Sequence, residues 1–370
     1  MSQTPASRQP LTQIPREVCC AQDYEWLAPH FIGEAAHAYV AGGCGPEQTL
    51  AANRAAFEQT AILPRMLVDV TAGHTALELF GRRLQHPVLL APVAYQTLVH
   101  PLGEVETARG AAATDSCLVV STLAGRTLEE VATQAGDERW FQLYFQPRRA
   151  DTANLLSRAE AAGYKVLMVT LDTAIKTPSL RAQRAAFVMP PQVVAASLAD
   201  YPLPPQRLLE RGQSLVFQGA MGEAPTWDDL AWLLGQSSLP VIVKGVLRPA
   251  DAQRLQAMGV AGLVVSNHGG RALDGVPASL RLLPAIRAAV GAGYPLLLDS
   301  GIRSGSDVFK ALALGADAVM VGRLQIYALA VAGALGVAHL LKLLRGELEV
   351  CMAQAGCATL ADIGPDMIYH

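Results

Sequence analysis

The sequence predicts an α/β protein built as one (β/α)8 barrel, the TIM-barrel fold. Eight short, apolar runs rich in β-branched residues recur along the chain, and segments with helical periodicity separate them. This alternation predicts parallel strands joined by right-handed crossovers, and the apolar runs predict burial on both faces. No predicted strand is followed by the GxGxxG turn of a Rossmann domain. A closed barrel is therefore favoured over an open, doubly wound sheet.

Each predicted element has a range. The strands are 88–94, 117–122, 140–145, 166–172, 241–246, 262–267, 296–300 and 318–322. The helices between them are 103–114, 127–135, 151–162, 227–234, 249–258, 279–290 and 306–314. Thr127 and Glu130 have the spacing of a capping box, and Pro249 suits the first turn of a helix. Gly163, Gly259 and Gly315 are expected as left-handed residues at helix ends.

Two segments precede the barrel and one interrupts it. Residues 1–17 are polar, contain three prolines and are expected to be a flexible tail rather than a signal peptide. Residues 18–80 are expected to cap one end of the barrel. Residues 173–226, a long loop after strand four, are expected to be an active-site lid or a partner surface. Residues 18–370 then form a single domain.

Length and composition narrow the class of protein. The chain has 370 residues, 51% of them hydrophobic and 16% charged, which excludes a mainly disordered protein. The formal charge of −3 and the lack of a basic stripe argue against nucleic-acid binding. The six cysteines show no metal-ligand spacing, so we predict no metal site and a reducing, cytoplasmic location.

Residues 324–341 carry no charge if His339 is neutral, and they are long enough to span a bilayer. Because the segment is rich in Ala and Gly, a buried helix of a protein without membrane contact is the preferred interpretation.

Catalytic groups of such a barrel lie at the C-terminal ends of the strands and in the loops that follow. The polar or turn-forming candidates there are Pro92, Val93, Ala94, Ser121, Gln142, Tyr144, Thr170, Asp172, Lys244, Ser266, His268, Arg271, Asp299, Ser300, Gly301, Arg303, Gly322 and Arg323.

The last two strand ends predict a phosphate site. Gly301 and Gly322 allow a close approach of the backbone, and Arg303 and Arg323 can add charge-assisted hydrogen bonds. The alternative is a pair of ordinary turns with solvated arginines. Lys244 should meet an anion inside the barrel mouth, although a structural ion pair with a neighbouring carboxylate would satisfy it equally well.

His268 is the candidate general base, because an imidazole takes up a proton near neutral pH. Asp172, from the apposed fourth strand, could stabilise the imidazolium, and Arg271 offers a planar fork to a substrate carboxylate. A purely structural histidine is the competing interpretation.

These residues resemble the FMN-dependent α-hydroxy acid oxidases and dehydrogenases, which include glycolate oxidase, lactate oxidase, mandelate dehydrogenase and hydroxymandelate oxidase. The similar segments occur in the family's order from about Tyr39 to the last helix. They are WFQLYF (140–145), TLDT (170–173), LPVIVKGV (239–246), SNHGGRALD (266–274) and DVFKALALGADAVMVGR (307–323).

The resemblance implies roles for individual residues. His268 takes the substrate proton with support from Asp172, Arg271 binds the carboxylate, and Tyr39 and Tyr144 bind substrate oxygens. The residues implied to hold FMN are Lys244, Gln142, Thr170, Ser121 and Ser266 around the ring, the backbone of Pro92, Val93 and Ala94 beside N5, and Asp299, Ser300, Gly301, Arg303, Gly322 and Arg323 at the ribityl phosphate.

The implied reaction converts a 2-hydroxy acid into a 2-oxo acid. Ala94 resembles the oxidase residue, which favours O2 as electron acceptor and hydrogen peroxide as product. Leu123 stands where short-chain glycolate oxidases carry tryptophan, so a larger side chain could fit. A dehydrogenase that passes electrons to a quinone or protein remains an alternative. The resemblance also implies a homotetramer.

Two positions depart from the family pattern. Ser179 occupies the place of a second carboxylate-binding arginine, for which Lys176, Arg181 or Arg184 could compensate. If none does, an FMN oxidoreductase with a non-standard substrate becomes the further alternative. Ser300 replaces the first glycine of a DGG motif, a milder change.

Overall fold

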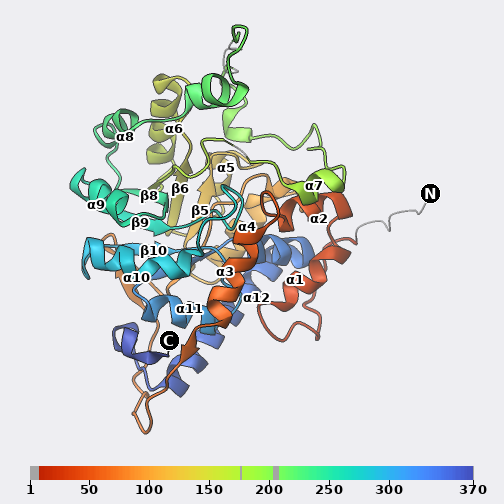
Figure 1. Ribbon diagram of the computed structural model, residues 1–370. Coiled ribbons are helices and arrows are strands. Elements are labelled where there is room, and N and C mark those ends of the chain that lie inside the picture. The colour runs from red at the N-terminus through yellow and green to blue at the C-terminus, as the bar shows by residue number, and fades with distance from the viewer. Residues whose placement is uncertain (1–7, 176, 203–207, 370) are drawn as a thin grey trace.

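A computed structural model describes residues 8–175, 177–202 and 208–369. Eight parallel strands close into a barrel in the order β10-β11-β4-β5-β6-β7-β8-β9, which confirms the predicted fold class (Figure 1). The barrel strands are β4 (Val88–Leu90), β5 (Leu118–Ser121), β6 (Arg139–Leu143), β7 (Leu167–Thr170), β8 (Val241–Val246), β9 (Gly262–Val265), β10 (Leu296–Leu298) and β11 (Ala318–Val321).

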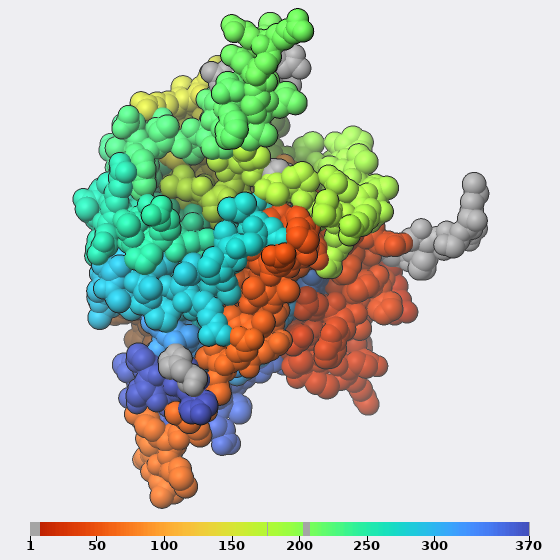
Figure 2. All heavy atoms as spheres, viewed as in Figure 1, coloured from red at the N-terminus to blue at the C-terminus, as the bar shows by residue number. Residues whose placement is uncertain are grey.

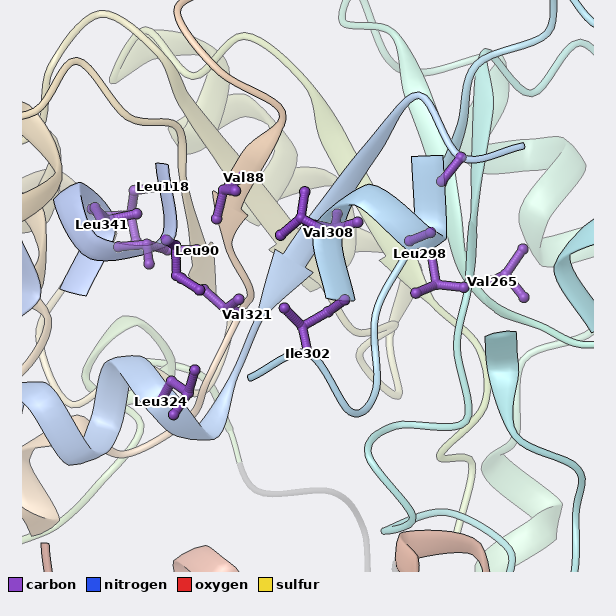
Figure 3. Close-up of a cluster of buried hydrophobic side chains, with 14 of the residues drawn as sticks. Val88, Leu90, Leu118, Val265, Leu298, Ile302, Val308, Val321, Leu324 and Leu341 are labelled. Atoms are coloured by element: carbon purple, nitrogen blue, oxygen red, sulfur yellow. The ribbon is translucent and has the colours of Figure 1, made fainter. Parts of the chain in front are cut away.

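Side chains that alternate along the strands build two apolar layers. Leu89, Met168 and Met320 belong to the cluster that fills the barrel interior. Leu90 and Val321 point the other way and pack under the surrounding helices, as Figure 3 shows. Burial on both faces explains why these strands contain so few polar residues before their C-terminal ends.

The helices around the barrel begin and end with the predicted chemistry. They are α4 (Glu104–Ala112), α5 (Leu128–Ala132), α6 (Arg149–Ala161), α8 (Trp227–Leu234), α9 (Pro249–Ala257), α10 (Ser279–Val290), α11 (Gly305–Ala313) and α12 (Arg323–Ala355). Thr127 and Glu130 form the capping box of α5, and Pro249 opens α9. Gly163, Gly259 and Gly315 have φ of 76°, 87° and 109°.

Several strands are shorter than predicted, and the difference lies mostly at their C-terminal ends. The predicted strand 88–94 ends at Leu90, since Pro92 has no N–H for the ladder. Likewise β7 ends at Thr170 and β10 at Leu298. The residues at the C-terminal ends of these predicted strands lie in the loops that follow, where they can face a ligand rather than a neighbouring strand.

The N-terminal region covers both ends of the barrel. It contains α1 (Asp23–Leu27), η1 (Ala28–His30), α2 (Glu34–Ala41), α3 (Gln48–Glu58) and the hairpin β2 (Leu77–Leu79) and β3 (Arg82–Leu84). The hairpin packs Leu79 and Leu84 into the interior cluster and closes one end. At the other end, residues 39–44 approach the C-terminal edges of the strands.

Residues 8–17 differ from the flexible tail that we predicted. The N–H of Leu11 donates to the carbonyl of Val331 at 2.8 Å, and Leu11 and Ile14 pack on the core. Ala332 and Gly333 break the helical geometry of α12, so the preceding carbonyl is available for this bond. Residues 1–7 lie outside the described part of the chain.

The segment 173–226 carries short elements and exposed apolar side chains. It holds α7 (Leu180–Arg184), η3 (Ala196–Leu198), η4 (Leu215–Gly219) and η5 (Ala220–Glu223). Leu208 and Phe217 are 92% and 72% exposed. The bright green part of this segment, around η4 and η5, projects at the top of Figure 2.

The long helix α12 includes the uncharged segment 324–341. It is the one helix in the described chain that is long and apolar enough to cross a membrane, but 78% of its most apolar window is buried. It packs against α4, α11 and α1, in agreement with the predicted buried helix. Two short strands, β1 (Ala61–Ile62) and β12 (Ile368–Tyr369), pair close to the C-terminal end of the chain, after η6 (Leu360–Asp362) and η7 (Pro365–Met367).

Candidate active site

A cavity of about 910 Å³ opens at the C-terminal ends of the barrel strands, a size suited to a cofactor together with a small substrate. The predicted site residues that line it are Tyr39, Pro92, Val93, Ala94, Tyr144, Thr170, Lys244, His268, Arg271, Asp299, Ser300, Gly301, Arg303, Gly322 and Arg323. Asp172 and Ser266 do not line the cavity themselves. They form hydrogen bonds with the lining residues His268 and Lys244, respectively. Ser121 and Gln142 are buried and bind each other at 3.0 Å.

His268 and Asp172 form the pair that the sequence predicted. The imidazole Nδ1 lies 2.9 Å from Asp172 Oδ1, and the backbone N–H of His268 donates to the Ser266 hydroxyl at 3.0 Å. His268 adopts a left-handed φ of 58°. Two reciprocal amide hydrogen bonds between Asn53 and Asn267 hold the loop from below. The ring position is therefore fixed by several independent contacts.

Asp172 stays ionised although it is buried. Burial by itself would raise the pKa of its carboxyl, but His268, Lys244 and the hydrogen bond from the imidazole lower that pKa below its usual value. An ionised carboxylate behind the ring can accept the Nδ1–H and stabilise an imidazolium. This arrangement leaves the other ring nitrogen to act on a ligand.

Lys244 meets an anion, and the anion is Asp299. The ammonium Nζ lies 3.1 Å from Asp299 Oδ2 and donates to the Ser266 hydroxyl at 2.9 Å. Burial disfavours the charged ammonium, yet Asp299, Asp172 and Tyr144 raise the pKa of Lys244. The structural ion pair that we gave as the alternative is thus present, and Lys244 still faces the cavity.

Arg271 is held against the N-terminal region. Its Nη1 donates to the carbonyls of Tyr39, Val40 and Gly42. Its guanidinium lies 5.0 Å from the centroid of the Tyr39 ring, and that ring stacks on Phe187 at 4.5 Å. Because one edge of the fork is tied down, the guanidinium is oriented before any carboxylate arrives.

The ends of β10 and β11 gather positive charge. Arg303 forms a two-pronged ion pair with Glu25, with N–O distances of 2.6 and 3.1 Å. Arg323 donates to the carbonyls of Val40, Gly269 and Gly42. Burial and the like charges of Arg271 and Arg303 lower the pKa of Arg323 to about 10. A phosphate at the N-terminus of α12 would offset this repulsion.

Ser179 caps a helix. Its hydroxyl accepts the N–H of Ala182 at 3.3 Å and starts α7. Arg181, one suggested substitute for a second substrate arginine, pairs with Glu47 on the surface. Arg184 is exposed, and Lys176 lies outside the described residues. Among the described side chains that line the cavity, Arg271 is the one guanidinium besides Arg303 and Arg323 at the ends of β10 and β11.

Ser300 keeps the loop after β10 intact despite replacing a glycine. It adopts a φ of 81°, its hydroxyl donates to Asp299 Oδ1 at 2.8 Å, and it accepts the N–H of Gly269 at 2.9 Å. These two hydrogen bonds offset the cost of a left-handed serine.

Sequence reasoning missed Glu25, Phe187, Met189 and Tyr95 as parts of the site. Glu25 reaches Arg303 from 278 residues away, and no local pattern signals such a contact. Phe187 and Met189 follow α7 in a segment without periodicity, and both line the cavity. Only Tyr95 carried a signal, since it adjoins the predicted Pro92–Ala94 turn.

Unpaired buried atoms test whether a flavin ring fits here. Within the described part of the chain, Gln142 Nε2 and Thr170 Oγ1 are buried and have no hydrogen-bond partner. Unpaired buried polar atoms are rare in native proteins. They lie at the ends of β6 and β7, beside Lys244, and they offer the donors and acceptors that the polar edge of a flavin needs. The residues present therefore fit FMN.

Fold and site define a class, a (β/α)8 barrel with a flavin-sized cavity lined by an imidazole and by guanidinium groups. Residues 28–370 match the family described as FMN-dependent dehydrogenase. The chain is 62% identical to L-lactate oxidase of Alicycliphilus denitrificans, over 97% of this chain and 98% of the relative. It is 38% identical to glycolate oxidase of Spinacia oleracea, with 94% of each covered.

Solved structures agree with these relatives. Mandelate oxidase with (S)-2-phenylpropionate superimposes with a TM-score of 0.85 at 38% identity, covering 95% of this chain and 97% of the other. The chain belongs to the FMN-dependent dehydrogenase family, and it is an FMN-dependent oxidoreductase. The predicted fold, cofactor and enzyme class are confirmed.

Proposed function

We propose that this protein oxidises a small (S)-2-hydroxy acid to the 2-oxo acid, with O2 as electron acceptor and hydrogen peroxide as the second product. L-Lactate is the first substrate to test, because the relative with 62% identity is an L-lactate oxidase. The observation that carries the proposal is the His268–Asp172 pair at 2.9 Å, in a cavity that Arg271 also lines.

The protein's own groups account for substrate binding and proton transfer. Arg271 binds the carboxylate, and the Tyr39 and Tyr144 hydroxyls bind substrate oxygens. The neutral His268 ring accepts the hydroxyl proton, and Asp172 stabilises the resulting imidazolium. Burial raises the pKa of Tyr144, so its phenol remains a hydrogen-bond donor at neutral pH.

When bound, FMN would supply the two-electron redox chemistry that couples oxidation of the substrate to reduction of O2. Around its ring we assign Lys244, Ser121, Gln142, Thr170 and Ser266. Lys244 would stabilise negative charge on the ring. The Pro92–Ala94 backbone would line the N5 side, and the groups assigned to the ribityl phosphate are Asp299, Ser300, Gly301, Arg303, Gly322 and Arg323.

The decisive experiment is to purify the protein, record its visible spectrum and add hydroxy acids without oxygen. L-Lactate, glycolate, mandelate and a long-chain 2-hydroxy acid are tested separately. We expect a yellow protein whose 450-nm band is bleached fastest by L-lactate. If none of these acids bleaches the band, hydroxy-acid oxidation is the wrong assignment, and a non-standard substrate is favoured.

Oxygen use is tested in the same preparation. One hydrogen peroxide per 2-oxo acid formed is expected of an oxidase. A low peroxide yield with rapid reduction of a quinone analogue would favour the dehydrogenase alternative, with residues 190–226 as the docking surface.

We also propose a homotetramer in the cytoplasm. The family resemblance supports the tetramer, which light scattering tests. The cysteines in the described chain are all free thiols, which is consistent with a reducing compartment.

A further inference from the structure

One buried carboxylate connects two loops of the active-site wall. Glu104 is the first residue of α4 and is 2% exposed. Its Oε1 accepts the backbone N–H of Gln96, in the loop after β4, at 2.9 Å. The same oxygen accepts the N–H of Gly125, in the loop after β5, also at 2.9 Å. A single carboxyl oxygen therefore binds both loops.

Both loops carry cavity residues beside these anchored amides. Tyr95 and Leu123 line the cavity, and the N–H of Tyr95 donates to the Leu123 carbonyl at 3.0 Å. Tyr95 has a left-handed φ of 55°, which costs energy for a bulky residue and requires support from its surroundings. Tyr95 lines the same cavity as Tyr39, which we assign to the substrate, so this wall adjoins the substrate side.

A second contact from α4 reinforces the first loop. The Thr107 hydroxyl donates to Gln96 Oε1 at 2.5 Å, and Gln96 Nε2 donates to the Val93 carbonyl at 3.4 Å. Thr107 and Gln96 are both buried. Through Gln96, α4 thus holds both the start and the end of the turn 93–96.

The Glu104 carboxyl uses only one of its oxygens for these hydrogen bonds. Within the described chain, Glu104 Oε2 and Arg126 Nε are buried without hydrogen-bond partners. An unpaired buried carboxylate oxygen is costly. The two hydrogen bonds that Oε1 accepts therefore account for the placement of this side chain.

We propose that Glu104 is a positioning residue, which fixes the β4 and β5 loops so that Tyr95 and Leu123 form a rigid wall against the side chain of the substrate. The role of the wall rests on the proposed function. The anchoring of the loops does not, so the two are tested separately.

Amide hydrogen exchange tests the anchoring without any substrate. In Glu104→Ala, the Gln96 and Gly125 amides should exchange about tenfold faster or more than in the wild type. Glu104→Gln keeps the Oε1 acceptor and should leave both amides protected. Thr114→Val is the matched control, because Thr114 binds the carbonyls of Gly110 and Ala111 at the far end of the same helix. Unchanged exchange at both amides in Glu104→Ala overturns the proposal.

Steady-state kinetics test the wall. The ratio of kcat/KM for L-lactate to that for 2-hydroxyoctanoate should change about tenfold in Glu104→Ala, because small displacements of a positioning wall alter rates strongly. Thr107→Val, which removes the hydroxyl that binds Gln96, should shift the ratio in the same direction, and it replaces Glu104→Ala as the test variant if Glu104→Ala does not fold. Thr107→Ser keeps the hydroxyl and should show the wild-type ratio. The positioning role is contradicted if this kcat/KM ratio is the same in Glu104→Ala and Thr107→Val as in the control Thr114→Val. If the wild type oxidises neither acid, the proposed function fails while the exchange result still decides the anchoring.

Discussion

Arg303 and Glu25 form an ion pair that joins the loop after β10, assigned to the phosphate, to helix α1. Both N–O contacts, at 2.6 and 3.1 Å, use the Nε–Nη2 edge of the guanidinium, and Arg303 is 8% exposed. Burial alone would raise the pKa of the Glu25 carboxyl, but Arg303, Arg323 and Arg54 lower it. Glu25 therefore supplies negative charge where three arginines converge.

Removing Glu25 should destabilise the FMN-free protein more than the FMN-bound protein. In Glu25→Gln the free energy of unfolding of the FMN-free form should fall by about 1–3 kcal/mol, since a buried guanidinium loses its charged partner. Bound phosphate would supply part of the missing charge and reduce the loss. Thermal unfolding with and without saturating FMN measures the difference.

The control for this experiment is Glu349→Gln, which breaks an exposed i,i+4 pair with Arg345. It should change stability by less than about 0.5 kcal/mol in both forms. Equal losses in the two forms of Glu25→Gln would show that Glu25 has no relation to the phosphate.

Replacing His268 should stop catalysis without releasing the cofactor. His268→Gln should slow anaerobic bleaching by L-lactate about 10²–10⁴-fold, the usual contribution of a general base. The visible spectrum should stay that of bound FMN, because His268 is assigned to the substrate and not to the cofactor. Stopped-flow absorbance measures the rate, and a wild-type rate would exclude His268 as the base.

Asp172 should make the folded protein sensitive to acid. Its pKa in the folded protein is lowered from the ordinary value of 3.8. As the pH falls, the Asp172 carboxyl of the unfolded chain therefore takes up a proton before that of the folded protein. The stabilising contribution is complete above about pH 5 and is lost as the pH falls through the lowered pKa.

Denaturant unfolding of wild type and Asp172→Asn between pH 3 and 7 measures this effect. The wild-type free energy of unfolding should fall more steeply below pH 4 than that of the variant. A constant difference across the whole range would contradict the lowered pKa.

Arg271 and Ser179 should differ in their effects on substrate binding. Arg271→Lys should raise the KM for L-lactate about 10–100-fold, since an ammonium cannot keep the three backbone contacts and also present a fork to a carboxylate. Ser179→Ala removes a helix cap and should cost about 1 kcal/mol of stability, with a much smaller rise in KM. If Ser179→Ala raises KM as much as Arg271→Lys, Ser179 binds the carboxylate.

The sequence alone determined the barrel, since the alternation of apolar strands and helices depends on local periodicity and on burial of both strand faces. Since the strands of such a barrel are parallel, their C-terminal ends all face the same side, and the sequence therefore also predicted that Lys244, His268 and Arg303 lie at the cavity. The tertiary structure decided which groups pair. Glu25 reaches Arg303 and Glu104 joins two loops through contacts that no sequence period encodes. Tertiary packing also decided where residues 8–17 bind. The Val331 carbonyl can accept the N–H of Leu11 only because α12 loses its helical geometry at the next two residues.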